Sequence, residues 1–161
     1  MHFKNLLHFY SMEQLNFPHY TMNFKNRENK PYIFDRVRKK WLLCTPEEWV
    51  RVHVVSYLIE TKGYPASWMR IEQELRVFGT RKRFDLVVVD AAMKSYILVE
   101  CKAPSVPINQ KTFDQITRYN LELQCPYLMV SNGLNHYFCK MNFEENSLTW
   151  IEELPNYSSI S

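Results

Sequence analysis

The sequence of 161 residues contains only three glycines and no long apolar run. A membrane-spanning helix needs about 18 or more consecutive apolar residues, and no segment here approaches that length. Low complexity and disorder are likewise disfavoured by the composition. The N-terminal segment 1–14 has neither the apolar core nor the small-residue cleavage site of a signal peptide. We therefore expect a cytoplasmic protein with no membrane segment.

Cysteine is scarce and unpaired. No C-x-x-C motif occurs, and the four cysteines stand far apart in the chain: Cys44, Cys101, Cys125 and Cys139. Paired motifs mark most zinc sites, and a disulfide framework is typical of small secreted chains. The spacing therefore indicates buried, reduced thiols rather than a zinc site or a set of disulfides.

What the chain does have is apolar and aromatic residues, at 46% and 15% of the total. A chain of this length and composition can bury one core, which predicts a single domain. We place that domain at residues 23–157, after a flexible leader of residues 1–22 and before a short tail at 158–161.

Positive charge is concentrated in two segments although the net charge is only +3. Residues 23–40 hold seven basic and two acidic residues, and a second basic cluster covers residues 81–83. Such clusters suit a polyanionic partner such as DNA, and an ordinary solvated surface explains them equally well. The residues chosen as DNA-contacting candidates are Lys39, Lys40, Arg81, Lys82 and Arg83.

Two segments have the periodicity and end signals of helices. At residues 46–61, Thr45 is the predicted N-cap, Pro46 stands at the first helical position, and Glu48 completes a capping box. A second helix is predicted over residues 110–124 with Asn109 as its cap.

Short alternating or apolar runs predict the strands. An N-terminal hairpin is expected before the first helix, a three-stranded antiparallel meander between the two helices, and further strands after the second helix. The expected strands cover residues 32–34, 41–43, 69–78, 84–90, 95–102, 127–131, 137–141 and 148–151. This order predicts an α/β sandwich with a central mixed sheet and a helix on each face.

The hairpin of residues 84–90 and 95–102 brings charged residues together at one end. With a four-residue loop at 91–94, Asp85 lies opposite Glu100, and directly opposed residues share a face. Lys102 is two residues further along the strand and so projects to that face as well. The pattern therefore predicts that two acids and one amine converge at the end of an apolar hairpin.

Two carboxylates held this close repel each other unless a cation joins them. Mg²⁺, with Mn²⁺ as a substitute, suits one or two carboxylates plus waters, and the backbone carbonyl of Cys101 is a third candidate ligand. Such an ion activates water and neutralises charge on a phosphoryl oxygen, while Lys102 orients that water or stabilises the transition state. The alternative is a structural Lys–Glu pair with Asp85 capping the strand end.

Three stretches carry a family resemblance. "RFDLVVVD", "LVECKAP" and "FDQITRYN" together resemble the D…(D/E)-x-K core and Q-x-x-x-Y motif of the PD-(D/E)xK nuclease superfamily. The Q-x-x-x-Y motif accompanies this core in the N-terminal nuclease domain of type I restriction enzyme R subunits, which the chain resembles, and in RecB-like nucleases. Flanking stretches such as "TPEEWVRVHVVSYLIETKGYP" and "PYLMVSNGLNHY" extend the resemblance over roughly residues 12–157.

The resemblance implies a restriction-endonuclease-like α/β/α sandwich and a Mg²⁺-dependent DNA endonuclease. Asp85 and Glu100 would be metal ligands, Lys102 the catalytic lysine, and Gln115 and Tyr119 the helical pair of the motif. Many members of the superfamily also use a supporting acid. On the first helix Glu47, Glu48 and Glu60 are available, but capping already accounts for Glu48. The candidates retained for this supporting role are Glu48, Glu72 and Glu74.

The sequence differs from restriction R subunits in lacking one motif. No G-x-x-x-x-G-K-[ST] loop occurs, so the sequence contains no P-loop translocase. Expected partners are DNA and the methylation, specificity or translocase subunits of a restriction system, with a transient dimer for cutting both strands. The alternative function is a non-catalytic module that binds DNA or docks onto such an assembly.

Overall fold

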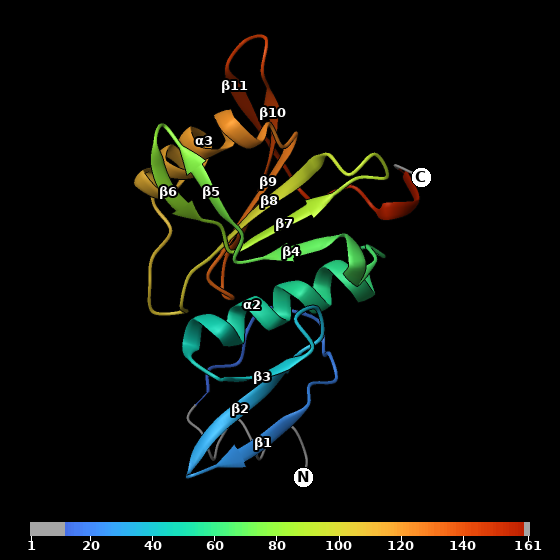
Figure 1. Cartoon of the computed structure of the whole chain (residues 1–161), viewed down its shortest axis with the longest axis vertical. Coiled ribbons are helices and arrows are strands. Elements are labelled where there is room, and N and C mark those ends of the chain that lie inside the picture. The colour runs from blue at the N-terminus through green and yellow to red at the C-terminus, as the bar shows by residue number, and fades with distance from the viewer. Residues whose placement is uncertain (1–11, 160–161) are drawn as a thin grey trace.

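The computed structural model describes residues 12–159, and a six-stranded mixed sheet forms its centre (Figure 1). Its strand order is β11-β10-β9-β8-β7-β4, with β8 and β9 parallel and every other pair antiparallel. The strands are β4 (Met69–Ile71), β7 (Leu86–Val89), β8 (Ser95–Cys101), β9 (Tyr127–Ser131), β10 (His136–Asn142) and β11 (Ser147–Ile151).

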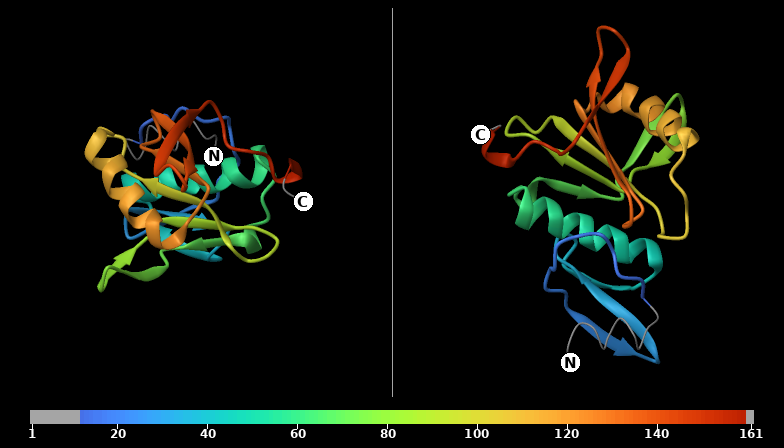
Figure 2. Two further views of the ribbon diagram at one scale, coloured as in Figure 1. Left: turned by 90° about the horizontal axis from the view of Figure 1, so that it is seen from above. Right: turned by 180° about the vertical axis from the view of Figure 1, so that it is seen from behind.

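One long helix packs on each face of this sheet (Figure 2). Helix α2 (Pro46–Ser56), which continues as a π-helical turn at Tyr57–Thr61, shares a core with Leu86, Val88, Ile97 and Val99. Helix α3 (Gln110–Leu123) shares the opposite core with Val87, Leu98, Leu128 and Val130. Successive strand residues therefore alternate between the two cores. This confirms the predicted sandwich with a central mixed sheet.

Both helices begin where their caps predict. Thr45 Oγ1 accepts a hydrogen bond from the Glu48 N–H at 3.2 Å, and Asn109 accepts one from Thr112 N–H at 3.4 Å. The other half of the predicted capping box, in which the Glu48 side chain binds the Thr45 N–H, is wrong, however. The Glu48 carboxylate points to Arg38 and Arg51 instead, because two guanidinium groups lie beside it.

The N-terminal region is more ordered than expected. A three-stranded antiparallel sheet, β1 (Phe24–Arg27), β2 (Lys30–Asp35) and β3 (Lys40–Leu43), contains the predicted hairpin plus one unpredicted strand. Residues 12–22 are not a free leader, since Leu15 and Tyr20 are buried and the Asn16 N–H donates to the Gly133 carbonyl at 2.7 Å. Residues 1–11 of the expected leader lie outside the described residues.

The single strand predicted at 69–78 is wrong. Glu72 has φ 55, in the left-handed region, and this turn separates β4 from β5 (Glu74–Val77). Strand β5 then pairs with β6 (Thr80–Arg83) in a separate two-stranded hairpin. Both halves of this segment form strands, as the alternating pattern predicts, but the turn at Glu72 places them in different sheets.

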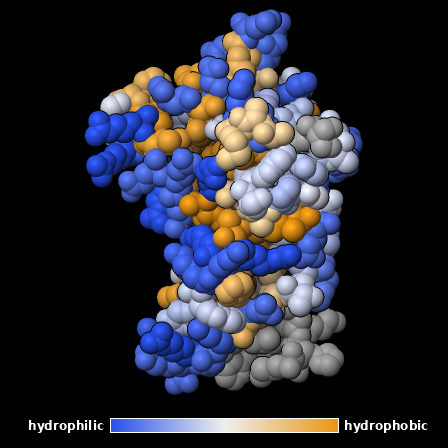
Figure 3. All heavy atoms as spheres, turned by 45° about the vertical axis from the view of Figure 1, so that its right-hand side comes forward, coloured by the Kyte–Doolittle hydropathy of each residue, from blue (hydrophilic) through white to orange (hydrophobic). Residues whose placement is uncertain are grey.

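The remaining short elements lie next to each other. They are 3₁₀ turns at Ala66–Trp68 and Tyr157–Ser159, whose Trp68 and Tyr157 rings pack edge to face at 5.0 Å. The four cysteines are buried and free, as predicted, and burial raises the pKa of Cys44 to about 12. In Figure 3, apolar side chains gather near the middle of the visible face, with hydrophilic ones above and below. Within residues 12–159 no helix has the length and hydropathy needed to cross a membrane.

Candidate active site

The charged end of the β7–β8 hairpin has the predicted register. Leu86 pairs with Val99 and Val87 with Leu98, which places Asp85 opposite Glu100. A bulge between Val88 and Val89 shifts the register only at the far end. The two carboxylates therefore sit at the end of the sheet where β7 begins and β8 finishes.

Asp85 is held from two sides by the protein itself. Its Oδ2 accepts the backbone N–H of Cys101 at 2.7 Å, and its Oδ1 accepts Arg51 Nη2 at 3.3 Å. An ionised carboxylate offers about four acceptor sites, so each oxygen keeps one lone pair for another ligand. The two contacts fix the orientation of Asp85 without using up its capacity.

The surroundings of Glu100 disfavour its charged form. Burial raises the pKa of Glu100, the neighbouring Asp85 carboxylate raises it further, and Lys102 lowers it, which leaves it at about 7. Lys102 Nζ lies 3.2 Å from Glu100 Oε1. Burial alone would lower the pKa of Lys102, but Glu100 and Asp85 outweigh it and raise that pKa. Lys102 is therefore an ammonium at neutral pH and forms an ion pair with Glu100.

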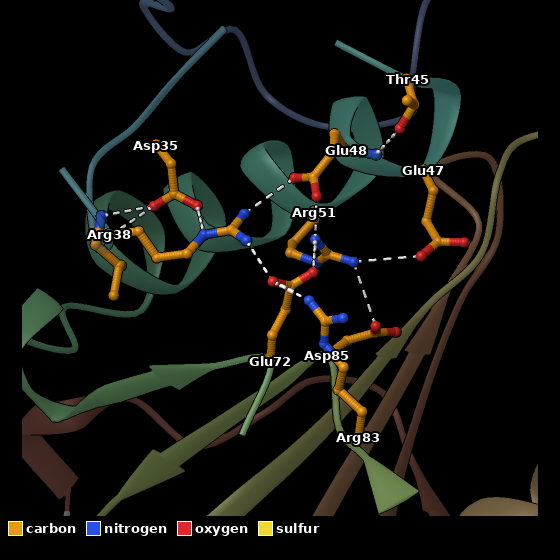
Figure 4. Close-up of polar contacts among 10 residues, drawn as sticks. Asp35, Arg38, Thr45, Glu47, Glu48, Arg51, Glu72, Arg83 and Asp85 are labelled. Atoms are coloured by element: carbon orange, nitrogen blue, oxygen red, sulfur yellow. Dashed lines mark hydrogen bonds and ion pairs between the residues drawn. The ribbon is translucent and has the colours of Figure 1, made fainter. Parts of the chain in front are cut away.

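A buried arginine of α2 connects this pair to other acids (Figure 4). Arg51, whose side chain is only 4% exposed, contacts Asp85, Glu72 at 3.4 Å, Glu47 at 3.2 Å, and Glu48. Burial alone would lower the pKa of Arg51, yet nearby acids, chiefly Glu48 and Asp85, raise it. In the described part of the chain its Nε is buried with no hydrogen-bond partner. Arg51 thus joins α2 to the start of β7.

A second arginine extends the same network towards the N-terminal sheet (Figure 4). Arg38 binds the buried Asp35 at 2.6 Å, Glu48 at 3.1 Å and Glu72 at 2.9 Å. Arg83, at the end of β6, also pairs with Glu72. Although burial opposes it, this set of cations lowers the pKa of Glu72. The network explains why Glu72 turns out of its strand towards α2.

The candidates for a supporting acid separate clearly in space. Glu48 and Glu72 lie inside the arginine network, whereas Glu74 is exposed on β5 opposite Arg83. Glu47 is the acid of α2 that shares the electrostatic field of the site. Burial raises the pKa of Glu47 and Asp85 raises it further, while Arg51 and Lys102 lower it. Glu47 is therefore an acid of the first helix whose charge interacts with that of Asp85.

The motif pair of α3 lies beside the site rather than in it. Gln115 Nε2 donates to the Tyr119 hydroxyl at 2.9 Å, and the Tyr119 ring packs edge to face on Phe84 at 5.8 Å. Lys82 Nζ lies 5.4 Å from the centre of the same ring. Within residues 12–159 neither Gln115 nor Tyr119 hydrogen-bonds Lys102. The pair thus borders the β6–β7 junction.

The other basic candidates fall into two places. Arg81, Lys82 and Arg83 belong to β6, and only Phe84 separates this strand from Asp85. Lys39 and Lys40 are exposed at the β2–β3 turn of the N-terminal sheet. The first group is adjacent to the acidic pair in the chain, and the second belongs to the sheet below α2 (Figure 1).

The family model described as type I restriction enzyme R protein N terminus matches residues 46–155, which is most of the chain and includes Arg51, Asp85, Glu100 and Lys102. The chain belongs to this family. Among solved structures, its fold is similar to that of a fragment from Vibrio vulnificus YJ016 that is described as an HsdR subunit of a type I restriction enzyme, at TM-score 0.52 and 18% identity. That match covers 73% of this chain and 24% of the Vibrio chain, so this chain spans about a quarter of its relative. None of the curated proteins compared with it matches.

Sequence patterns did not reveal the arginine network of this R-protein N-terminal domain. Arg51 interrupts an apolar helical run, and Glu47 and Glu48 precede it by four and three residues. Such i,i+3 and i,i+4 pairs are the signal by which a buried, paired arginine could be found. Arg38 and Asp35 form an i,i+3 pair of their own, but the bonds from Arg38 to Glu48 and Glu72 join distant segments and leave no sequence pattern.

Replacing Glu100 should stabilise this domain when no divalent cation is present. The pKa of Glu100 is higher in the folded chain than the unfolded value near 4.5, so the folded chain keeps this proton longer. The stability that this raised pKa contributes is fully present below pH 4.5 and is lost as the pH rises through about 7. Glu100→Gln should therefore raise the free energy of unfolding by roughly 2 kcal/mol at pH 8 in EDTA, and by less at pH 5.

Urea denaturation at the two pH values measures this effect. The control is Glu144→Gln, which changes the same group at an exposed position after β10. A Glu100→Gln gain that is absent at pH 8, or as large at pH 5, would show that the folded chain does not disfavour the ionised form of Glu100.

Proposed function

We propose that this domain is a divalent-cation-dependent DNA endonuclease, with Mg²⁺ as cofactor and Mn²⁺ as its substitute. The observation that carries the proposal is the pair of opposed carboxylates, Asp85 and Glu100, with Lys102 at 3.2 Å from Glu100. The family of the chain supports it, since R proteins belong to restriction enzymes.

The residues at the hairpin end fit a hard cation. Asp85 and Glu100 are close enough that Asp85 raises the pKa of Glu100, which is the repulsion that a bound cation removes. The described residues contain no group of three or more His, Cys, Asp or Glu side chains arranged around a metal position. Two carboxylates plus waters are what Mg²⁺ commonly takes, so this donor set suits it better than zinc.

The backbone of Cys101 adds a third donor to the proposal. In an extended strand the N–H and C=O of one residue point to the same side. Since the Cys101 N–H points to Asp85, its carbonyl is directed to the same edge of β8. The cation held there would lower the pKa of a bound water and neutralise charge on a phosphoryl oxygen.

Lys102 has a defined role in this mechanism. Its raised pKa keeps it protonated, so it acts as a hydrogen-bond donor and a positive charge rather than as a base. It can therefore stabilise negative charge that builds on the phosphate as the bond breaks. Its ion pair with Glu100 keeps the ammonium at the acidic pair in the absence of DNA.

The surrounding polar residues supply the proposed DNA contacts. Arg81, Lys82 and Arg83 precede Asp85, and the Gln115–Tyr119 pair retains hydrogen-bonding atoms beside the same junction. Lys39 and Lys40 would extend the contact over the N-terminal sheet. We further propose that methylation, specificity or translocase subunits of a restriction system are its partners.

Nicking of supercoiled plasmid tests the function. Wild type should nick with Mg²⁺ or Mn²⁺ and not in EDTA, while Asp85→Asn should not nick under any of these conditions. Asp90→Asn is the matched control, since Asp90 lies at the other end of the same hairpin. Equal nicking by wild type and Asp85→Asn would contradict the proposal and favour the non-catalytic DNA-binding or docking module.

A further inference from the structure

The β5–β6 hairpin projects from the sheet next to α3, with its turn free at the end (Figures 1 and 2). Its inner face is anchored. Leu75 and Val77 pack into the α3 core, and Lys82 stacks over the Tyr119 ring. Alternation along the strands then places Arg76 and Arg81 on the outer face, where both are exposed.

The outer face holds an unfavourable charge pair. Arg76 and Arg81 are direct cross-strand partners, and like charges in that arrangement destabilise a hairpin. Arg83 on the same face is paired with Glu72. Within residues 12–159 no acid forms an ion pair with Arg76 or Arg81. An external anion between the two guanidinium groups would relieve this repulsion.

The turn of the hairpin also carries an unfavourable residue. Phe78 and Gly79 both have positive φ, 49 and 75, which is the two-residue turn that favours Asn-Gly or Gly-Gly. Phenylalanine rarely adopts this conformation, and here the residue is 65% exposed. Neither packing nor backbone preference accounts for an aromatic residue at this position.

We propose that this hairpin is a DNA-contacting arm that enters the major groove of duplex DNA. The major groove accepts a two-stranded β-ribbon, and cations opposite each other on one face can contact phosphates or base edges. Arg76 and Arg81 supply those cations, and Phe78 supplies an apolar contact at the tip. The inference rests on the proposed function for its substrate class, and β6 leads from the arm directly to Asp85.

Binding without cleavage tests the arm. The full chain is titrated onto a fluorescent 20-base-pair duplex and onto one of its single strands, in EDTA and at several salt concentrations. We expect the double variant Arg76→Ala/Arg81→Ala to bind duplex at least tenfold more weakly. It should also lower the slope of log K against log salt by about 1.8, since each phosphate contact contributes about 0.9. Lys94→Ala/Lys140→Ala removes two exposed charges elsewhere and should change affinity less than twofold.

Phe78→Asn separates a binding role from a structural one. Asparagine tolerates the left-handed turn, so this variant should raise the midpoint of thermal unfolding by about 2–4 °C. It should also weaken duplex binding at least threefold. A purely structural Phe78 would instead give lower or equal thermal stability with unchanged binding.

Three results would contradict the proposal that the β5–β6 hairpin is a DNA-contacting arm. They are equal binding by Arg76→Ala/Arg81→Ala and its lysine control, tighter binding to the single strand than to the duplex, and unchanged binding by Phe78→Asn. Because these titrations contain no divalent cation, they do not depend on catalysis. If the chain nicks no plasmid but still binds duplex DNA through Arg76 and Arg81, the proposed DNA-contacting arm is supported. The proposed nuclease function is then contradicted.

Discussion

Arg51→Met is expected to lower the free energy of unfolding by about 3–5 kcal/mol, the cost of removing one partner from a buried charge network. The side chain of Arg51 is 4% exposed and contacts four carboxylates from three segments of the chain. Methionine would fill most of its volume and leave Glu48, Glu72 and Asp85 facing one another without their shared cation. The loss should therefore exceed what the missing packing explains.

Urea denaturation in EDTA measures the loss. Arg36→Met is the matched control, because Arg36 forms a single ion pair with Glu60 in which both side chains are 39% exposed. Exposed pairs contribute about 0–1 kcal/mol. Arg51→Lys should fall between the two, since it keeps the charge but not the planar fork of donors. Equal losses for Arg51→Met and Arg36→Met would show that the network does not hold α2 to the site.

Lys102→Met is expected to reduce the rate of phosphodiester cleavage by about 10²–10³-fold, the usual effect of removing one preorganised donor to a developing charge. Its neighbours Glu100 and Asp85 raise the pKa of Lys102, so in the proposed mechanism the variant loses a positive charge beside the phosphate. Binding of DNA should change little, because the basic residues of β6 remain.

Single-turnover cleavage of a labelled duplex at saturating protein measures this step apart from binding. Lys94→Met, at the opposite end of the same hairpin, is the control and should cleave at the wild-type rate. A loss smaller than tenfold for Lys102→Met would remove this lysine from the catalytic mechanism.

The sequence was sufficient to predict the end of the β7–β8 hairpin because its determinants are local. The apolar runs around Val87 and Leu98 fix which residues face each core, and the short loop fixes which residues are opposite. The bulge at Val88 lies between the loop and the site, yet the pairs nearest Asp85 keep the predicted register. Both helices followed from equally local caps at Thr45 and Asn109.

The features that the sequence did not predict depend on contacts between distant segments. Glu72 adopts a left-handed backbone while its carboxylate meets Arg38, Arg51 and Arg83, residues 34, 21 and 11 positions away. Residues 12–22 look irregular because their order comes from packing, as when the Trp49 indole donates to the Glu13 carbonyl at 2.9 Å. Such partners leave no periodic pattern in the chain.

Crystals grown with Mn²⁺, with anomalous data collected at the manganese absorption edge, test most directly whether this hairpin end is a cation site. We predict one anomalous peak between the carboxylates of Asp85 and Glu100, with the Cys101 carbonyl as a further ligand, and no such peak in Asp85→Asn. Saturating Mn²⁺ that leaves this position without a peak, or gives the same peak in Asp85→Asn, would contradict the proposed nuclease site.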